Sequence, residues 1–391
     1  MSAKILILTA GFGEGHNAAA RALAEACNAQ EGAGTAKMVD AFALAAPRLN
    51  TLSRRSYLEM INRAPGLWRW AYGWLDRSTL APRLLRSLFL ERRALARVIA
   101  VEQPALLCST YPVYGFLLDA LGRSGLQLPP HVNVVTDSIS INSLWWRAHC
   151  DAWFLPNEDS ATVLRQAGIA ERQLQVLGFP VSSRFAEETA RQAPPDPAAG
   201  RGRVLYIVNS GTKGAAETAR RLLRDTEWEV TCTVGRNDVL RRELETLAGQ
   251  RSQPARILGW TDEIPALLAS HHVVVSKAGG ATTQEALAAR CPMIVNQIVP
   301  GQEEGNYELL RRHGVGALAE TPDAVIVELR RAFAGGGAIW RQWRLALEPL
   351  SRPHAARDIA TALLARLEVR EAIPLPLRQP TDCGRSAHVP A

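Results

Sequence analysis

The stretch Ile5–Ala20, ILILTAGFGEGHNAAA, is the part of the sequence that most clearly predicts the fold. It begins with a short apolar run ended by glycines, which is typical of a buried parallel strand. The alanine-rich residues 18–27 predict a helix, and residues 36–40 predict a second strand. A strand, a glycine loop, a helix and a strand in this order begin a doubly wound α/β sheet.

The same cycle recurs along the chain. Further short apolar runs predict strands at residues 105–108, 131–135, 152–155, 175–177, 204–208, 230–234, 256–258, 273–275 and 293–296. Prolines and glycines gather at residues 189–203, which predicts a linker between two series of strands. We therefore expect two Rossmann-like domains facing a cleft, over residues 1–188 and 204–368, and a loose tail over residues 369–391.

The composition narrows the class of protein. With 391 residues, the chain is long enough for two domains, and 47% of its residues are hydrophobic. Its six cysteines form no CxxC pair and no metal-ligand cluster is visible, so we expect neither metal nor cofactor and a reducing, cytoplasmic compartment. No run of 18 apolar residues predicts a membrane-spanning helix. The net charge of +7 favours an anionic partner, although a coding bias toward arginine explains it equally well.

The glycine loop Gly11–His16 leads into the first predicted helix. Glycines let a backbone approach a ligand closely, and a helix N-terminus favours an anion. The spacing differs from the dinucleotide-binding fingerprint, because the sixth position is histidine. His16 could act as a general base at this junction, or it could cap the helix without any chemistry.

Three loops of the C-terminal half suit a nucleotide sugar. Residues 209–214 could contact a phosphate or sugar, although a tight structural turn would have the same sequence. Residues 276–285 place glycines and threonines at a helix start, where they could bind a diphosphate. Glu285 could then accept hydrogen bonds from a ribose, or it could simply complement the helix dipole. Residues 300–306 are rich in amide and carboxylate groups, which suit sugars but also occur in solvated loops.

In this order, the loops resemble those of the monogalactosyldiacylglycerol synthases and the related processive diacylglycerol glucosyltransferases. Three blocks carry the resemblance: Ile5–Ala20, Val134–Phe185 with VVTD at its start, and Val275–Gly316 with SKAGGATTQEAL and PGQEEGN. The likeness spans residues 4–335, and its last block is the most specific. A more distant relative is the glucosaminyltransferase that completes the lipid-linked peptidoglycan precursor.

The resemblance implies the two-domain glycosyltransferase fold called GT-B, with a UDP-sugar held mainly by the C-terminal domain. His16 and Asp137 are the implied candidates for the catalytic base. Lys277 or Arg236 could add positive charge beside the leaving UDP. The implied donor-binding residues are Ser210, Gly211, Trp260, Thr261, Gly279, Gly280, Ala281, Thr282, Glu285, Gln302, Glu303 and Asn306.

Residues 48–101 predict a helical insertion that is basic and aromatic. Residues 51–100 hold ten arginines and three acidic residues. The resulting charge of this segment, +7, equals the net charge of the whole chain. With Trp68, Trp70 and Trp74, this composition favours peripheral contact with an anionic membrane surface and entry of a lipid acceptor. An ordinary helical insertion with a solvated basic face is the alternative. No nucleic-acid motif accompanies the charge, so we do not expect a nucleic-acid partner.

Together these features predict an inverting transfer of a hexose from a UDP-sugar to a membrane lipid hydroxyl, in diacylglycerol-type glycolipid synthesis at the inner face of the cell membrane. Two alternatives stay open. A UDP-sugar epimerase on the same fold would need no lipid, and a catalytically silent nucleotide-sugar binding protein would use the Trp and Arg residues only as an anchor.

Overall fold

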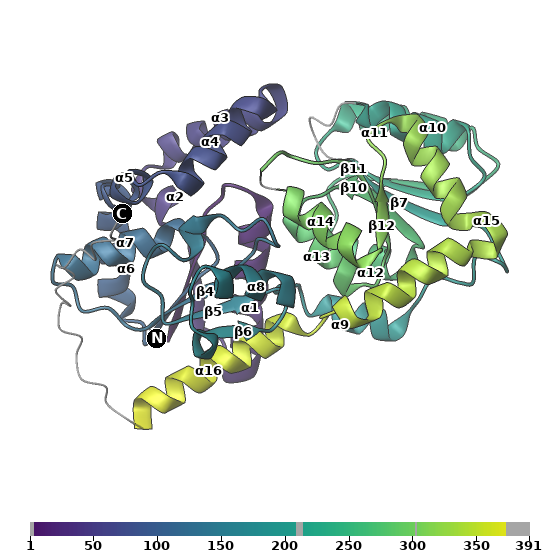
Figure 1. The fold of residues 1–391 in the computed structure, drawn as a ribbon. Coiled ribbons are helices and arrows are strands. Elements are labelled where there is room, and N and C mark those ends of the chain that lie inside the picture. The colour runs from purple at the N-terminus through teal and green to yellow at the C-terminus, as the bar shows by residue number, and fades with distance from the viewer. Residues whose placement is uncertain (1–3, 209–213, 302, 373–391) are drawn as a thin grey trace, which may run out of the picture.

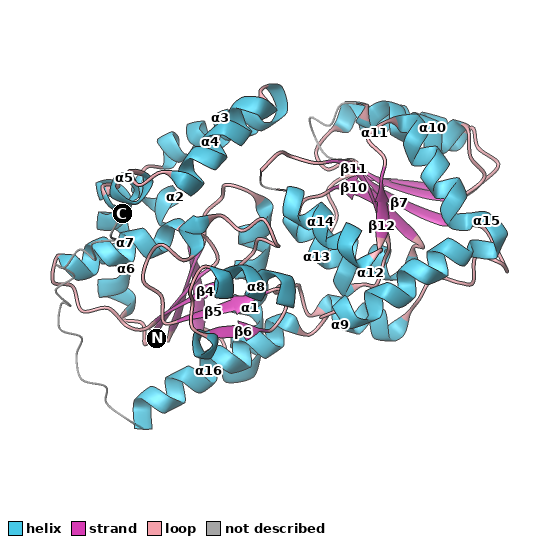
Figure 2. Ribbon diagram, viewed as in Figure 1, coloured by secondary structure: helices cyan, strands magenta, loops and turns pink. Residues whose placement is uncertain are grey.

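The computed structural model describes residues 4–208, 214–301 and 303–372. Two parallel six-stranded sheets form the centres of two α/β domains, so the predicted fold class is confirmed (Figures 1 and 2). The strand order is β2-β1-β3-β4-β5-β6 in the N-terminal sheet and β12-β11-β10-β7-β8-β9 in the C-terminal sheet. The carboxyl ends of the parallel strands face the region between the domains, where open α/β sheets bind ligands.

The N-terminal sheet is buried on both faces. Along β1 (Ile5–Leu8), Ile5 and Ile7 pack with α1 (Glu14–Glu31) and α16 (Ala355–Ala372). Leu6 and Leu8 pack on the other face with α6 (Phe89–Glu102) and α7 (Val113–Arg123). This alternation follows from the two-residue period of a strand, and it explains why the strand is apolar throughout. The strands are β1 (Ile5–Leu8), β2 (Ala36–Val39), β3 (Leu106–Ser109), β4 (His131–Val134), β5 (Ala152–Leu155) and β6 (Leu174–Val176).

The C-terminal sheet repeats this arrangement with one strand that we did not predict. That strand, β12, has three residues and pairs with β11. The strands are β7 (Arg203–Ile207), β8 (Glu229–Thr233), β9 (Ala255–Leu258), β10 (Val273–Lys277), β11 (Met293–Gln297) and β12 (Gly316–Leu318). The helices of this domain are α10 (Ala215–Arg224), α11 (Asp238–Gly249), α12 (Ile264–Ser270), α13 (Gly280–Ala288), α14 (Glu304–His313) and α15 (Pro322–Leu347).

The predicted helical insertion lies between β2 and β3, and α3 and α4 form an antiparallel pair at the edge of the domain (Figure 1). Pro47 and Pro65 occupy the first positions of these two helices, where a missing N–H costs nothing. The helices of the N-terminal domain are α1 (Glu14–Glu31), α2 (Ala41–Ala45), α3 (Pro47–Arg63), α4 (Pro65–Arg77), α5 (Ala81–Arg86), α6 (Phe89–Glu102), α7 (Val113–Arg123) and α8 (Glu158–Gln166). Helix α9 (Arg184–Arg191) follows β6 in sequence but packs on α12 and α13 of the C-terminal domain.

The last helix, α16 (Ala355–Ala372), runs past residue 368, where we placed the end of the C-terminal domain. It follows the C-terminal sheet in sequence but crosses to the N-terminal domain and packs along α1 (Figure 1). Ile359 and Leu363 are completely buried in the same cluster as Ile5 and Ile7. The hydrophobic burial of this helix therefore stabilises the N-terminal domain and ties the two domains together.

A close contact joins the domains beside the cleft. A Cβ atom at Gly305, in the first turn of α14, would lie 1.9 Å from the carbonyl oxygen of Ser138. Only glycine permits this approach. The Nε2 amide of Gln284 also donates a hydrogen bond to the Ser138 hydroxyl at 2.9 Å. The loop after β4 is therefore fixed against α13 and α14.

Candidate active site

The glycine loop after β1 is held by Asp40, the residue that follows β2 and caps α2. One carboxylate oxygen of Asp40 accepts a hydrogen bond from the N–H of Gly11 at 3.1 Å, and the other caps α2 by accepting from Ala43 at 2.9 Å. The loop then enters α1 through Gly13, whose φ of 127° favours glycine. This geometry places His16 in the first turn of α1, facing the cleft.

His16 is 8% exposed, and its hydrogen bonds define which ring nitrogen carries the proton. Its Nδ1 lies 2.8 Å from the backbone carbonyl oxygen of Thr110 and 2.8 Å from the hydroxyl of Thr136. A carbonyl oxygen can only accept, so Nδ1 is the donor and Nε2 of the neutral ring holds a free electron pair. Burial lowers the pKa of His16 below 6.5, although the charge of Asp137 opposes the shift. A neutral imidazole with a free Nε2 is suited to accept a proton.

Asp137, at the end of the VVTD motif, lies next to His16. Its carboxylate accepts a hydrogen bond from the indole N–H of Trp145 at 2.7 Å. Burial raises the pKa of Asp137, while the charge of His16 and the Trp145 bond oppose this shift. Asp137 is therefore oriented by Trp145 and can stabilise a positive charge that forms on His16.

The N-termini of two helices converge on the cleft. Helix α13 begins at Gly280 after the extended residue Gly279, and α1 begins beside Gly15. A Cβ atom at Gly15 would lie only 3.6 Å from the backbone nitrogen of Ala281. Both helices direct unpaired N–H groups and the positive ends of their dipoles to this region, which is the arrangement that binds phosphate groups.

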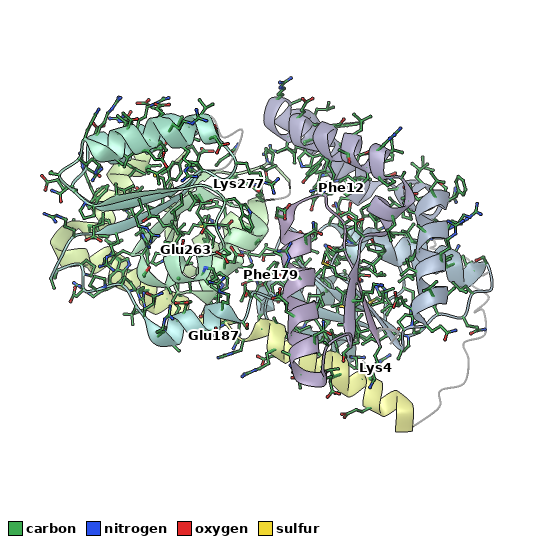
Figure 3. All side chains as sticks on the ribbon, turned by 180° about the vertical axis from the view of Figure 1, so that it is seen from behind. Lys4, Phe12, Phe179, Glu187, Glu263 and Lys277 are labelled. Carbon is green, nitrogen blue, oxygen red and sulfur yellow. The ribbon has the colours of Figure 1, made fainter. Side chains whose placement is uncertain are left out.

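Polar side chains from β10 and α14 complete this region, and Figure 3 shows Lys277 and Phe12 on the two facing domains. The ammonium group of Lys277 forms an ion pair with Oε1 of Glu303. Oε2 of Glu303 accepts the backbone N–H of Val299 at 3.0 Å, so both carboxylate oxygens hold the loop. Asn306 donates to the carbonyl of Ala278 at 2.9 Å, while its own buried Oδ1 has no partner among the described residues.

These residues surround an interdomain cavity of about 420 Å³. It brings together His16, Asp137, Lys277 and most of the diphosphate loop that we predicted from the sequence. The lining residues are Gly13, Glu14, Gly15, His16, Tyr57, Ile61, Thr136, Asp137, Lys277, Gly279, Gly280, Ala281, Thr282, Gln297, Val299, Glu303 and Asn306.

Glu285 lies one helical turn beyond Ala281, on the same side of α13. It is outside the first turn of the helix, so the alternative that it complements the helix dipole does not hold. Burial raises its pKa from 4.5 to about 7. No hydrogen bond or ion pair to this carboxyl occurs in the described part of the chain, which leaves both oxygens available to a ligand.

The other predicted donor residues lie outside the cavity. Arg236 is exposed in the turn after β8, and Trp260, after β9, is 73% exposed. The hydroxyl of Thr261 accepts the backbone N–H of Glu263 at 3.1 Å and so shapes the start of α12. The predicted residues Ser210, Gly211 and Gln302 lie outside the described residues.

A second cavity, of about 580 Å³, lies within the N-terminal domain and is lined mainly by apolar and aromatic side chains. His16, Tyr57 and Asp137 line both cavities, so the two spaces meet at these three residues. The other lining residues are Phe12, Leu52, Ser53, Ser56, Met60, Trp68, Tyr72, Leu75, Leu85, Tyr111, Pro112, Val113, Asn142 and Leu144.

Helix α4 presents two apolar faces. Trp68, Tyr72 and Leu75 follow a helical spacing and line the second cavity. Trp70 and Trp74 project from another face and are 67% and 39% exposed. The three predicted membrane tryptophans therefore divide into one cavity residue and two surface residues.

Exposed apolar residues concentrate around this helix. Of the sixteen large apolar side chains exposed in the described part of the chain, twelve belong to residues 38–101. Most of them belong to the same segment of the chain as the arginines of the insertion, so its exposed residues are both apolar and basic. Among the described helices, none combines the length and apolar character needed to cross a membrane.

Comparison with known proteins links this architecture to a family. Residues 16–181 match the family model described as monogalactosyldiacylglycerol (MGDG) synthase. A processive diacylglycerol beta-glucosyltransferase of Bacillus cytotoxicus is 24% identical over 368 residues, which cover 92% of this chain and 93% of that protein.

Solved structures share the fold at lower identity. MurG of Acinetobacter baumannii aligns with a TM-score of 0.60 at 12% identity, covering 93% of this chain and 99% of that one. A UDP-GlcNAc 2-epimerase from Neisseria meningitidis, bound to UDP-GlcNAc, aligns with a TM-score of 0.56 at 13% identity, covering 92% and 99%. The fold is thus the two-domain GT-B fold. By sequence, the chain is similar to the monogalactosyldiacylglycerol synthases and to the processive diacylglycerol glucosyltransferases.

Proposed function

We propose that the chain is an inverting glycosyltransferase that moves a hexose from a UDP-sugar to the hydroxyl group of a diacylglycerol-type membrane lipid. The observation that carries the proposal is the position of His16, which lines both the polar interdomain cavity and the apolar cavity of the N-terminal domain. A base at this junction can reach a sugar donor on one side and a lipid hydroxyl on the other.

The polar cavity suits the diphosphate of a nucleotide sugar. The N-termini of α1 and α13 bring two positive dipole ends together, and an anion between them would offset their repulsion. Lys277 lies in this cavity as a cation paired with Glu303. Oδ1 of Asn306, which has no partner among the described residues, can accept a hydrogen bond from a sugar hydroxyl. The fold relative that binds UDP-GlcNAc supports a UDP donor.

The apolar cavity suits part of a lipid. Its volume of about 580 Å³ falls in the range of roughly 300–1,000 Å³ typical of small-molecule sites. The exposed Trp70 and Trp74 lie on the helix that forms one wall of the cavity, so a lipid could pass from a bilayer without crossing water. Each arginine near an anionic surface contributes about 1 kcal/mol of membrane attraction. The name of the Bacillus relative supports a diacylglycerol acceptor.

We propose that the protein is peripheral and acts at the inner face of the cell membrane. The exposed apolar and basic side chains of the insertion support this location. The five described cysteines are buried and free, which fits a reducing compartment.

The chemistry is a direct displacement. Nε2 of His16 takes the proton of the lipid hydroxyl while the hydroxyl oxygen bonds to the anomeric carbon of the sugar. The bond between that carbon and the diphosphate oxygen breaks, and its electron pair leaves with UDP. Asp137 stabilises the imidazolium, and the helix N-termini stabilise the charge on UDP. Attack opposite the leaving group inverts the anomeric configuration.

Product analysis tests the proposal against its alternatives. The protein is incubated with labelled UDP-glucose or UDP-galactose and with vesicles that contain diacylglycerol, and the products are separated by chromatography. We expect labelled glycolipid from at least one donor. A changed or free sugar without glycolipid would instead support an epimerase on this fold, and bound but unreacted donor would support a silent binding protein.

A further inference from the structure

The indole nitrogen of Trp68 is a buried hydrogen-bond donor that lacks an acceptor in the described part of the chain. Buried polar groups are nearly always hydrogen-bonded, and a buried tryptophan N–H usually finds a partner. An indole can only donate, unlike the hydroxyls of Ser53 and Ser56 in the same cavity, which can rotate to donate or accept. The missing partner must therefore be an acceptor atom.

Trp68 lies near the end of the apolar cavity that meets the donor site. Its ring packs edge-to-face on Tyr57, with ring centroids 5.0 Å apart. Tyr57 lines both cavities, together with His16. A lipid whose hydroxyl reaches His16 would therefore place the groups next to that hydroxyl close to Trp68.

We infer that the Trp68 N–H donates a hydrogen bond to an ester carbonyl oxygen of the lipid acceptor, so that the enzyme selects ester-linked over ether-linked glycerolipids. This inference rests on the proposed function. In a 1,2-diacylglycerol, one ester group is attached to the carbon next to the one that bears the free hydroxyl, and the other to the carbon beyond it. Their carbonyl oxygens are the strong acceptors that lie beside the apolar chains. An ether-linked lipid has the same chains and hydroxyl but no carbonyl oxygen.

The contact with Tyr57 is the competing explanation. An indole N–H that points to the face of an aromatic ring makes a weak hydrogen bond, which could satisfy Trp68 without any ligand. The two explanations differ in consequence, because only the carbonyl partner makes the enzyme sensitive to the type of lipid linkage.

The experiment compares two acceptors in the same vesicles of phosphatidylcholine and phosphatidylglycerol. One acceptor is a diacylglycerol and the other is the dialkylglycerol with matching chains. Initial rates with labelled UDP-hexose give kcat/KM for the wild-type protein, for Trp68→Phe, and for the control Trp70→Phe on the exposed face of the same helix. Phenylalanine keeps an aromatic ring but removes the N–H. The smaller side chain affects both acceptors alike, so the ratio of their kcat/KM values reports the hydrogen bond.

We expect the wild-type protein to use the diacylglycerol roughly tenfold better, because a site built to hydrogen-bond a substrate group rejects the analogue that lacks it. Trp68→Phe should bring this ratio close to one, and Trp70→Phe should leave it unchanged. Equal use of both lipids by the wild-type protein, or an unchanged ratio in Trp68→Phe, would overturn the inference and leave the proposed function intact. Transfer to neither lipid would contradict the proposed function and this inference with it.

Discussion

The buried charge of Glu285 should lower the stability of the fold, whereas the same carboxylate should strengthen binding of the donor. The variant Glu285→Gln measures both effects. Burial raises the pKa of Glu285 from 4.5 to about 7 in the folded protein. The unfolded chain therefore loses this proton at lower pH than the folded protein, and stability is lost as the pH rises from about 4.5 to about 7. The difference between the two pKa values corresponds to at most about 3 kcal/mol.

Glutamine removes the charge and keeps the shape of the side chain. Relative to the wild-type protein, Glu285→Gln should therefore be more stable at pH 8 by up to about 3 kcal/mol and nearly unchanged at pH 4.5. If the carboxylate accepts ribose hydroxyls, the same variant should bind UDP about tenfold to a hundredfold more weakly, because hydrogen bonds to a charged group contribute about 1.5–3 kcal/mol. Donor binding by the wild-type protein should also weaken as the pH falls through 7.

Denaturant unfolding at the two pH values and calorimetric titration with UDP measure the two effects. Glu308→Gln serves as a control, because hydrogen bonds from Arg311 and Arg312 lower the pKa of Glu308 to about 2. That variant should not gain stability at pH 8 and should bind UDP normally. If Glu285→Gln were no more stable than the wild-type protein at pH 8, the conclusion that the buried charge of Glu285 lowers stability would be wrong. A gain with unchanged UDP affinity would refute the ribose contact.

Three further predictions follow from the N-terminal half. Burial lowers the pKa of His16, so kcat should stay constant near pH 7 and fall only as the pH drops below 6.5. A pH profile of kcat measures this, and a loss of activity centred above pH 6.5 would oppose the assignment of His16 as the base. Trp145→Phe should lower kcat several-fold at unchanged donor KM, because Asp137 loses the 2.7 Å hydrogen bond that orients it. Steady-state kinetics that match the wild-type protein would show that Trp145 does not orient Asp137 for the reaction. Replacing Trp70 and Trp74 by serine should reduce co-sedimentation with anionic vesicles at unchanged thermal stability, and undiminished sedimentation would remove these residues from the membrane surface.

Much of the fold was predictable because parallel strands leave a strong local signal. Both faces of each sheet are covered, so the strands are short apolar runs that end at glycine or polar residues. All eleven predicted strands occur. The missing strand, β12, has only three residues, and its backbone bends through Gly316 at φ 131°. The domain that α16 joins could not be predicted, because apolar spacing shows that a helix is buried but not which sheet buries it.

The candidate site was predictable where it depends on loops at strand ends. His16, Asp137, Lys277 and the Gly279–Thr282 loop all line one cavity. Tyr57 was missed, although it lines both cavities, because an isolated tyrosine in α3 carries no local signal of the cleft.

The division of the three tryptophans was readable in advance. At 100° per residue, positions 68 and 72 share one face of a helix, whereas 70 and 74 share another. The structure places Trp68 and Tyr72 in the cavity wall and leaves Trp70 and Trp74 exposed. The sequence could not show that the indole N–H of Trp68 lacks an acceptor among the described residues, because that depends on which atoms of the folded chain surround it.

The central claim is that one histidine joins a nucleotide-sugar site to a lipid site, and a single-turnover reaction tests it most directly. Enzyme in excess over labelled UDP-hexose is mixed with diacylglycerol vesicles, quenched at intervals and analysed for glycolipid and its anomeric configuration, with the wild-type protein and His16→Ala side by side. We predict that the wild-type protein converts the label to inverted glycolipid, and that His16→Ala binds the donor equally well but reacts about a hundredfold or more slowly. Wild-type turnover by His16→Ala, or release of the label as free hexose by the wild-type protein, would contradict the account.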